Sequence, residues 1–279
     1  MATLQVEDGK KIYFEHYKSG NKTPVLLING WGASVRVWDL TLPALLKAGH
    51  EVVVFDQRGC GKSDKDFADV SVQAIASDAI QIIEATGINR PALLGWSFGA
   101  AVAVEVAAQV GALSALLLVG PPTPKYLQAP DYPYGGTAEI LEQTLSALSQ
   151  DRPNFLRGLA QGMAAQDLGN TMVDWLWQML MQTSPVADES MNDLGRIDHR
   201  EILPKLTVPT AVYYGAKDAI IDPEIARVCA ALVPNSELLE FAESGHAPFL
   251  EESSRFNDNV VDFLRKSGEK KPRRKLSLG

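Results

Sequence analysis

The chain has 279 residues, a hydrophobic fraction of 46% and a charged fraction of 22%, which fits one globular α/β domain with room for an insertion. Its formal net charge of −8 argues against nucleic acid as a partner, and Cys60 and Cys229 give neither a disulfide framework nor metal-ligand spacing. Without an apolar signal core near the amino terminus or an uninterrupted membrane span, we expect a cytoplasmic protein with no stable membrane insertion.

The first part of the chain alternates short strands with helices. Two β-rich segments, 3–7 and 11–17, flank Asp8-Gly9, which indicates a hairpin. Continuous apolar runs, typical of strands buried on both faces, lie at 24–29, 51–55 and 115–119 and just before Ser97. Helical patterns lie between them. This alternation predicts a mostly parallel central sheet with helices on both faces.

The stretch Gly95-Trp96-Ser97-Phe98-Gly99 stands between an apolar strand and a helix rich in alanine and valine. This is the G-x-S-x-G pattern in the context that gives it chemical meaning. A serine at the tip of a tight strand-to-helix turn projects its hydroxyl away from the sheet. Glycines two residues before and after it let the strand and helix approach closely. The pattern therefore predicts Ser97 as a nucleophile.

From about 121 to 204 the sequence shows no convincing strand. Helical patterns occur near 137–149, 154–165 and 171–182, so we predict that 121–204 is an inserted helical cap. The cap holds five of the six methionines of the chain, and methionine suits a pliable apolar pocket. The alternative is that these side chains form the core of the cap. The side chains that we expect to line a substrate pocket are Trp96, Met163, Trp175 and Met179.

Alternation resumes after the cap. A strand at 209–214 is followed by Asp218, a strand at 236–241 is followed by His246, and a helix is expected over 253–266. The predicted core therefore comprises 1–120 and 205–266. Six of the fourteen residues from 266 onward are basic, and we predict that 267–279 is a disordered basic tail.

A serine hydroxyl needs a base within hydrogen-bond reach, and the base needs an orienting acid. Among the four histidines, only His246 lies in a loop just beyond the end of a predicted strand, where sites form in α/β sheets. Asp218 is the expected acid and Asp222 is its rival. Backbone N–H groups must hold the oxyanion. The candidate donors are Phe98, directly after the nucleophile, and Trp31, after the strand at 24–29.

Taken together, these motifs resemble the α/β-hydrolase superfamily over about residues 3–266. The matching segments are Asn29-Gly30-Trp31-Gly32, Asp56–Ser63, Gly95–Gly99, Gly215–Asp218 and Gly245-His246. Within the superfamily the chain is most similar to the carboxylesterase branch, which includes pimeloyl-acyl-carrier-protein methyl ester esterase. One departure is Asn29, which stands where the family usually has histidine. A serine at 97 argues against the dehalogenases and epoxide hydrolases, which carry aspartate there.

The resemblance implies a serine hydrolase that cleaves a carboxylic ester or lactone with an apolar acyl part through an acyl-enzyme on Ser97. The expected partner is a small-molecule ester or lactone, including an ester bound to an acyl carrier. No metal or organic cofactor is expected, and the oligomeric state is left open. The alternatives are an acyl-homoserine or enol lactonase, a perhydrolase or C–C bond hydrolase on the same triad, and a non-enzymatic sensor of a small ligand.

Overall fold

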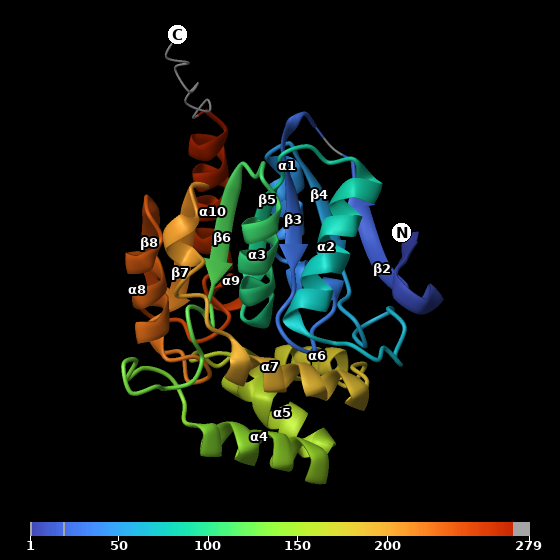
Figure 1. The fold of residues 1–279 in the computed structure, drawn as a ribbon, viewed down its shortest axis with the longest axis vertical. Coiled ribbons are helices and arrows are strands. Elements are labelled where there is room, and N and C mark those ends of the chain that lie inside the picture. The colour runs from blue at the N-terminus through green and yellow to red at the C-terminus, as the bar shows by residue number, and fades with distance from the viewer. Residues whose placement is uncertain (1, 19, 270–279) are drawn as a thin grey trace.

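One eight-stranded sheet runs through the computed structural model, which describes residues 2–18 and 20–269 (Figure 1). The strand order is β1-β2-β4-β3-β5-β6-β7-β8. The strands are β1 (Ala2–Gln5), β2 (Lys11–Tyr17), β3 (Lys22–Ile28), β4 (His50–Phe55), β5 (Ala92–Trp96), β6 (Ala115–Val119), β7 (Thr210–Gly215) and β8 (Ser236–Phe241). The pairs β1–β2 and β2–β4 are antiparallel and all other neighbours are parallel, so the mostly parallel sheet predicted from the alternation is confirmed.

The centre of the sheet is formed by the apolar runs that the sequence marked as buried strands. Leu27 on β3 pairs with Val54 on β4 and with Leu94 on β5, and all three side chains are buried. Because both faces of these strands are covered, a continuous apolar run replaces the alternation seen in half-exposed strands. Parallel strands bring their carboxyl ends to one edge, and the loops that follow β3, β5, β6, β7 and β8 meet there.

Helices cover both faces of the sheet. In Figure 1, α2 and α3 lie in front of the sheet, and α10 lies behind it. The helices outside the cap are α1 (Leu42–Lys47), α2 (Val72–Thr86), α3 (Phe98–Gln109), α8 (Pro223–Leu232), α9 (Pro248–Glu251) and α10 (Ser253–Glu269). Short 3₁₀ turns occupy Glu7–Gly9, Val35–Trp38, Pro185–Glu189 and Leu203–Lys205.

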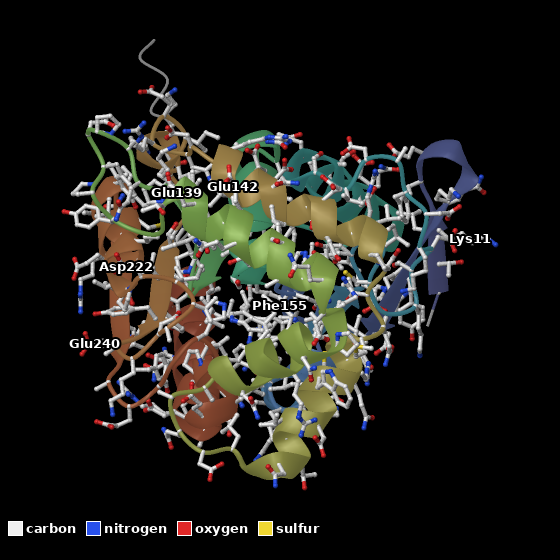
Figure 2. The ribbon with its side chains drawn as sticks, turned by 90° about the horizontal axis from the view of Figure 1, so that it is seen from below. Lys11, Glu139, Glu142, Phe155, Asp222 and Glu240 are labelled. Atoms are coloured by element: carbon white, nitrogen blue, oxygen red, sulfur yellow. The ribbon has the colours of Figure 1, made fainter. Side chains whose placement is uncertain are left out.

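The segment 121–204 forms a helical layer beyond the carboxyl ends of the strands (Figure 1). Its helices are α4 (Ala138–Gln150), α5 (Arg152–Gly162), α6 (Gly169–Leu180) and α7 (Ser190–Arg196). The first three coincide with the helical patterns of the sequence, whereas α7 has too few apolar residues to show a period. Figure 2, seen from the cap side, shows Phe155 of α5 near the middle of this layer and Asp222 towards the β7–α8 edge.

The predicted tail is wrong in its first residues. Helix α10 continues to Glu269 instead of ending at 266, and Ser267 is buried. The last turn of the helix therefore packs against the domain. The remainder of the predicted tail, 270–279, lies outside the described residues. Among the described residues no helix combines the length and apolarity that crossing a bilayer requires. The cytoplasmic location stays a prediction.

Candidate active site

Ser97 occupies the turn between β5 and α3. Its backbone has φ 53° and ψ −125°, a conformation that costs a non-glycine residue of order 1–3 kcal/mol. The turn is possible because its flanks are small. A Cβ on Gly95 would collide with the backbone of Gly99, and one on Gly99 would collide with the carbonyl oxygens of β3 and the following residue. The N–H of Ser97 donates to the carbonyl of Val119 at 2.8 Å, which fixes the turn beside the end of β6.

His246 and Asp218 form a buried pair at the same edge of the sheet. Nδ1 of His246 lies 2.8 Å from Oδ2 of Asp218, and both side chains are 2% exposed. Oδ1 of Asp218 accepts from the N–H groups of Ile220 (2.8 Å) and Ile221 (3.0 Å). A carboxylate held by these bonds assigns the proton to Nδ1 of the imidazole and leaves Nε2 as the acceptor. The pair has the geometry of a base with its orienting acid.

Gly120 joins the serine turn to the His246–Asp218 pair. It follows Val119, the residue that accepts the Ser97 N–H, and its φ is +50°. A Cβ at Gly120 would lie 3.2 Å from Nδ1 of His246 and 3.5 Å from Oδ2 of Asp218. The structure thus brings the three predicted residues to one place. Sequence reasoning missed Gly120, although a glycine directly after a buried strand and before Pro121 was the available signal.

The rival acid, Asp222, has another task. Its Oδ1 caps helix α8 by accepting from the N–H of Glu224 at 3.0 Å. Its Oδ2 accepts from the N–H of Gly135 at 3.0 Å and so ties the start of the cap to α8. Both carboxylate oxygens have backbone donors as partners. Asp222 is therefore occupied at a helix terminus, away from His246.

The other histidines also have partners of their own. His16 bonds Glu51, and His50 bonds a backbone carbonyl through Nδ1 at 2.8 Å. His199 lies in the loop after α7 and is buried. Its Nδ1 is 2.8 Å from Oγ1 of Thr123, and its Nε2 is 3.1 Å from Oε1 of Glu105. His199 thus ties both ends of the cap to α3.

Asn29 shapes the loop that follows β3. The residue is fully buried, and its Nδ2 donates to the carbonyl of Phe55 at 2.9 Å. Its Oδ1 accepts from the Trp38 indole at 2.9 Å, and its carbonyl accepts from the side chain of Gln57 at 2.7 Å. With its side-chain amide and its carbonyl hydrogen-bonded in this way, asparagine can hold the loop in place of the usual histidine. A Cβ on Gly30 would press on the ring of Trp96, so this loop packs against the serine turn.

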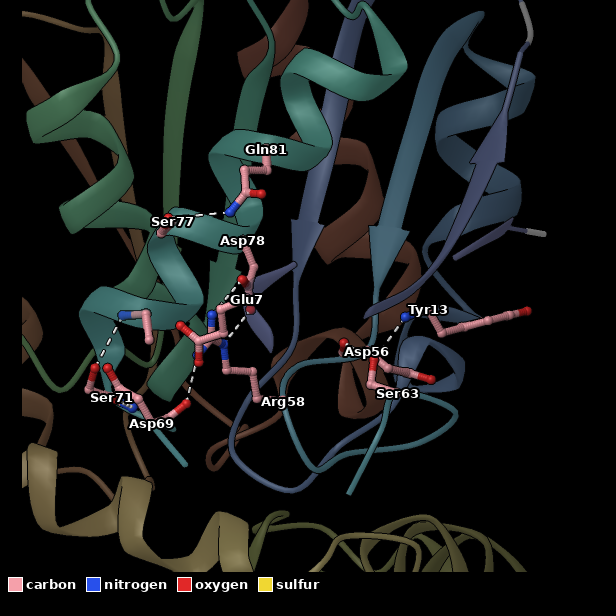
Figure 3. A network of polar contacts seen from close by, with 11 residues as sticks. Glu7, Tyr13, Asp56, Arg58, Ser63, Asp69, Ser71, Ser77, Asp78 and Gln81 are labelled. Atoms are coloured by element: carbon pink, nitrogen blue, oxygen red, sulfur yellow. Dashed lines mark hydrogen bonds and ion pairs between the residues drawn. The ribbon is translucent and has the colours of Figure 1, made fainter. Parts of the chain in front are cut away.

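A second loop, Asp56–Ser63, is braced from within. Asp56 accepts from the N–H of Val35 at 2.6 Å and from that of Lys62 at 2.7 Å, and burial raises the pKa of its carboxyl. In the same loop, Arg58 forms a buried bidentate pair with Asp78, donating to both carboxylate oxygens at 2.6 and 2.8 Å (Figure 3). The loop therefore acts as a rigid support for its neighbours.

The predicted pocket residues have different surroundings. The Trp96 ring is buried against His246 (centroids 5.4 Å) and Phe249 (5.0 Å), and its indole donates to the carbonyl of His246 at 2.9 Å. Trp96 therefore packs against the loop that carries the histidine and supports it. Met163 and Met179 are buried, and Trp175 is half-buried. The carbonyl of Met163 accepts from the N–H of Ala247 at 3.0 Å, which places this methionine next to the histidine loop.

One carboxylate fastens the cap to the histidine loop, and sequence reasoning missed it. Oε1 of Glu251 accepts from the N–H of Gly245 at 2.7 Å. Oε2 accepts from the N–H groups of Ala165 (2.8 Å) and Gln166 (3.0 Å) in the cap. Burial raises the pKa of this carboxyl, against the lowering effect of these bonds. The residue before His246 is thus held by the same side chain as the cap.

The mostly parallel sheet with helices on both faces, and the strand-to-helix turn at Ser97, are the architecture of an α/β hydrolase. The profile of the alpha/beta hydrolase fold family matches residues 23–253, and the chain belongs to that family.

Three relatives indicate where the chain lies within this family. It is 30% identical to a pimeloyl-acyl-carrier-protein methyl ester esterase of Vibrio atlanticus over 89% of this chain and 96% of that protein. An esterase from Exiguobacterium antarcticum superimposes with a TM-score of 0.91 at 31% identity, covering 94% and 98% of the two chains. A bromoperoxidase from Bacillus anthracis gives 0.90 at 25%, covering 95% and 99%. The chain is thus carboxylesterase-like, and its esterase relatives support a carboxylic ester hydrolase.

Proposed function

We propose that the protein is a serine hydrolase that cleaves a carboxylic ester or lactone with an apolar acyl part. The observation that carries this proposal is the buried His246–Asp218 pair beside the strained turn of Ser97. In this proposal the pair supplies Ser97 with a base and an orienting acid, which is what nucleophilic catalysis by a hydroxyl requires.

In the proposed reaction Nε2 of His246 takes the proton from the hydroxyl of Ser97, and the serine oxygen attacks the ester carbonyl. Asp218 holds the imidazole in the required tautomer. The N–H groups of Phe98 and Trp31 stabilise the oxyanion, and each such donor is worth about 3–4 kcal/mol in the transition state. The protonated imidazole then gives its proton to the leaving alcohol. Water, activated by His246, releases the acid from the acyl-enzyme.

The preference for an apolar acyl group rests on the cap. Met163 and Met179 are buried in the cap, Met163 beside the histidine loop, and methionine adapts to varied apolar shapes. We propose that these residues and Trp175 line the acyl site, with Trp96 supporting it from below. The esterase of Vibrio atlanticus is named for an acyl-carrier-bound ester, so such a substrate belongs in the panel beside simple esters and lactones.

The test is steady-state hydrolysis of p-nitrophenyl acetate, butyrate and octanoate by the wild-type protein and by Ser97→Ala. Loss of the nucleophile should reduce turnover to roughly 10³–10⁴ times the rate in water. A strong preference for acetate would contradict the apolar acyl site. Equal turnover in both proteins would contradict Ser97 as the nucleophile. Absence of turnover with these esters, lactones and acyl thioesters, together with stabilisation by a small ligand, would favour a sensor.

A second candidate follows from the similarity to the bromoperoxidase structure. In that case the acyl-enzyme on Ser97 would react with hydrogen peroxide in place of water and release a peracid. Bromination of monochlorodimedone that depends on peroxide, acetate and Ser97 would support it.

A further inference from the structure

The cap reaches the loop after β3 through a short segment, residues 183–187, which we name the cap anchor. It begins three residues after the end of α6 at Leu180. At its start, the hydroxyl of Thr183 donates to the carbonyl of Gly32 at 2.7 Å, and Thr183 is 3% exposed. Gly32 has φ +71°, and a Cβ there would lie 3.1 Å from the side chain of Leu180. The loop and the cap are therefore in close contact at this point.

Two further hydrogen bonds connect the cap anchor to the core. The indole of Trp31 donates to the carbonyl of Ala187 at 3.3 Å. The N–H of Ser184 donates to the carbonyl of Gly59 at 2.8 Å, in the loop that is braced by Asp56. The anchor thus contacts two core loops. One of them carries Trp31, a donor of the proposed oxyanion hole, and the other is a rigid support.

The cap anchor is itself held in place. Arg152, at the start of α5, donates through Nη2 to the carbonyl of Thr183 at 2.9 Å and forms an ion pair with Asp188. The first residue of the anchor and the residue that follows its end are therefore tied to the same guanidinium. A hydroxyl presented from a fixed backbone can fix the carbonyl that it binds, whereas one on a free loop would follow that carbonyl.

The Trp31 N–H belongs to the same peptide group as the Gly30 carbonyl, and that carbonyl accepts from the N–H of Ala33 at 3.3 Å. The Ala33 N–H belongs in turn to the same peptide group as the Gly32 carbonyl, which accepts from Thr183. We infer that Thr183 is a positioning residue, which sets the Trp31 N–H through Gly32 and so couples the cap to the oxyanion hole. This inference rests on the proposed function. A donor that is misaimed by a fraction of an ångström loses part of its stabilisation of the transition state but contributes little to substrate binding.

The experiment compares three variants in hydrolysis of p-nitrophenyl butyrate. Thr183→Val removes the hydroxyl and keeps the shape, Thr183→Ser keeps the hydroxyl, and Thr210→Val is the matched control. Thr210 is fully buried and donates to the carbonyl of Val208 at 3.0 Å, at the start of β7 and far from the site. We expect Thr183→Val to lower kcat about tenfold with KM unchanged, and Thr183→Ser and Thr210→Val to stay near the wild type.

Butylboronic acid, which forms a tetrahedral adduct with an active serine, gives a second readout. Its inhibition constant should rise about tenfold in Thr183→Val, in parallel with the loss in kcat, while that of the product butyrate stays constant. The inference is wrong if Thr183→Val changes kcat and boronate affinity no more than Thr210→Val does. Should Thr183→Val fail to fold, Thr183→Ala, which also removes the hydroxyl that binds the Gly32 carbonyl, replaces it with the same expected result.

Hydrogen exchange separates this inference from the proposed function. The amides of residues 30–33 should exchange faster in Thr183→Val than in Thr210→Val, whether or not the wild type hydrolyses esters. If the wild type is inactive but the amides of Thr183→Val exchange faster, the proposed function is wrong and the positioning by Thr183 stands. If the wild type is active but Thr183→Val shows neither faster exchange nor a lower kcat, the positioning by Thr183 alone is wrong.

Discussion

Gly120→Ala perturbs the His246–Asp218 pair by a single methyl group. Two costs follow from the structure. At φ +50° an alanine is strained by roughly 1–2 kcal/mol. The new Cβ would also stand 3.2 Å from Nδ1 of His246, inside the ordinary contact distance of about 3.5–4.0 Å. The imidazole must therefore move by a few tenths of an ångström. Displacement by 1 Å at such a site costs roughly a hundredfold in rate, so a shift of a few tenths of an ångström should lower kcat about 3- to 10-fold.

Gly87→Ala is the matched control, because Gly87 has φ +70° and nothing within 4 Å of an added Cβ. It should lose about 1–2 kcal/mol of unfolding free energy in a urea titration and keep full turnover of p-nitrophenyl butyrate. Gly120→Ala should lose at least as much stability and most of its turnover. If the two variants show equal kcat, the position of the imidazole is not held as tightly as the structure implies, and the reasoning is wrong.

Three further predictions concern buried polar groups. Arg58→Met leaves the Asp78 carboxylate buried without its cation. A urea titration should therefore show a loss of about 3–5 kcal/mol in unfolding free energy. A loss under about 1 kcal/mol would contradict the buried pair. Burial raises the pKa of the Cys60 thiol to about 12, so a disulfide reagent at pH 8 should label Cys60 only after denaturation, and rapid labelling of the native protein would count against this. The hydrogen bond from His199 holds the pKa of Glu105 below its ordinary value near 4.5. The stability that the ionised Glu105 contributes is therefore complete above pH 4.5 and is lost as the pH falls through the lower folded-state pKa. The unfolding free energy of the wild type should fall more steeply in acid than that of Glu105→Gln, and parallel curves for the two proteins would contradict this contribution of Glu105.

The sequence predicts the sheet and the placement of the site because both depend on local signals. The buried strands show as continuous apolar runs, and parallel strands must bring the residues after them to one edge. Ser97 and Asp218 each follow such a strand, and His246 follows the partly exposed edge strand β8, so all three are expected at that edge. These local signals could not decide whether Asp218 or Asp222 is the partner of the histidine. The two lie in the same loop, and only the contacts of each carboxylate distinguish them.

The contacts between cap and core could not be predicted, because they join segments that lie far apart in the chain and leave no period in the sequence. Thr183 bonds Gly32 across 151 positions, and Glu251 bonds Ala165 across 86. Each depends on one side chain that meets one backbone group. The contacts of His199 are of the same kind, since its partners Thr123 and Glu105 come from other parts of the chain.

The most direct test of the central claim is covalent labelling of the nucleophile. Diethyl p-nitrophenyl phosphate transfers its phosphoryl group to an activated serine and releases p-nitrophenol, so one equivalent of each can be counted. We predict one diethylphosphoryl group per chain, mapped by peptide mass spectrometry to Ser97, with loss of ester turnover in proportion to labelling and no labelling of Ser97→Ala or His246→Ala. Full turnover in the labelled protein, or a label on another residue that tracks the loss of activity, would contradict the assignment of Ser97 and His246.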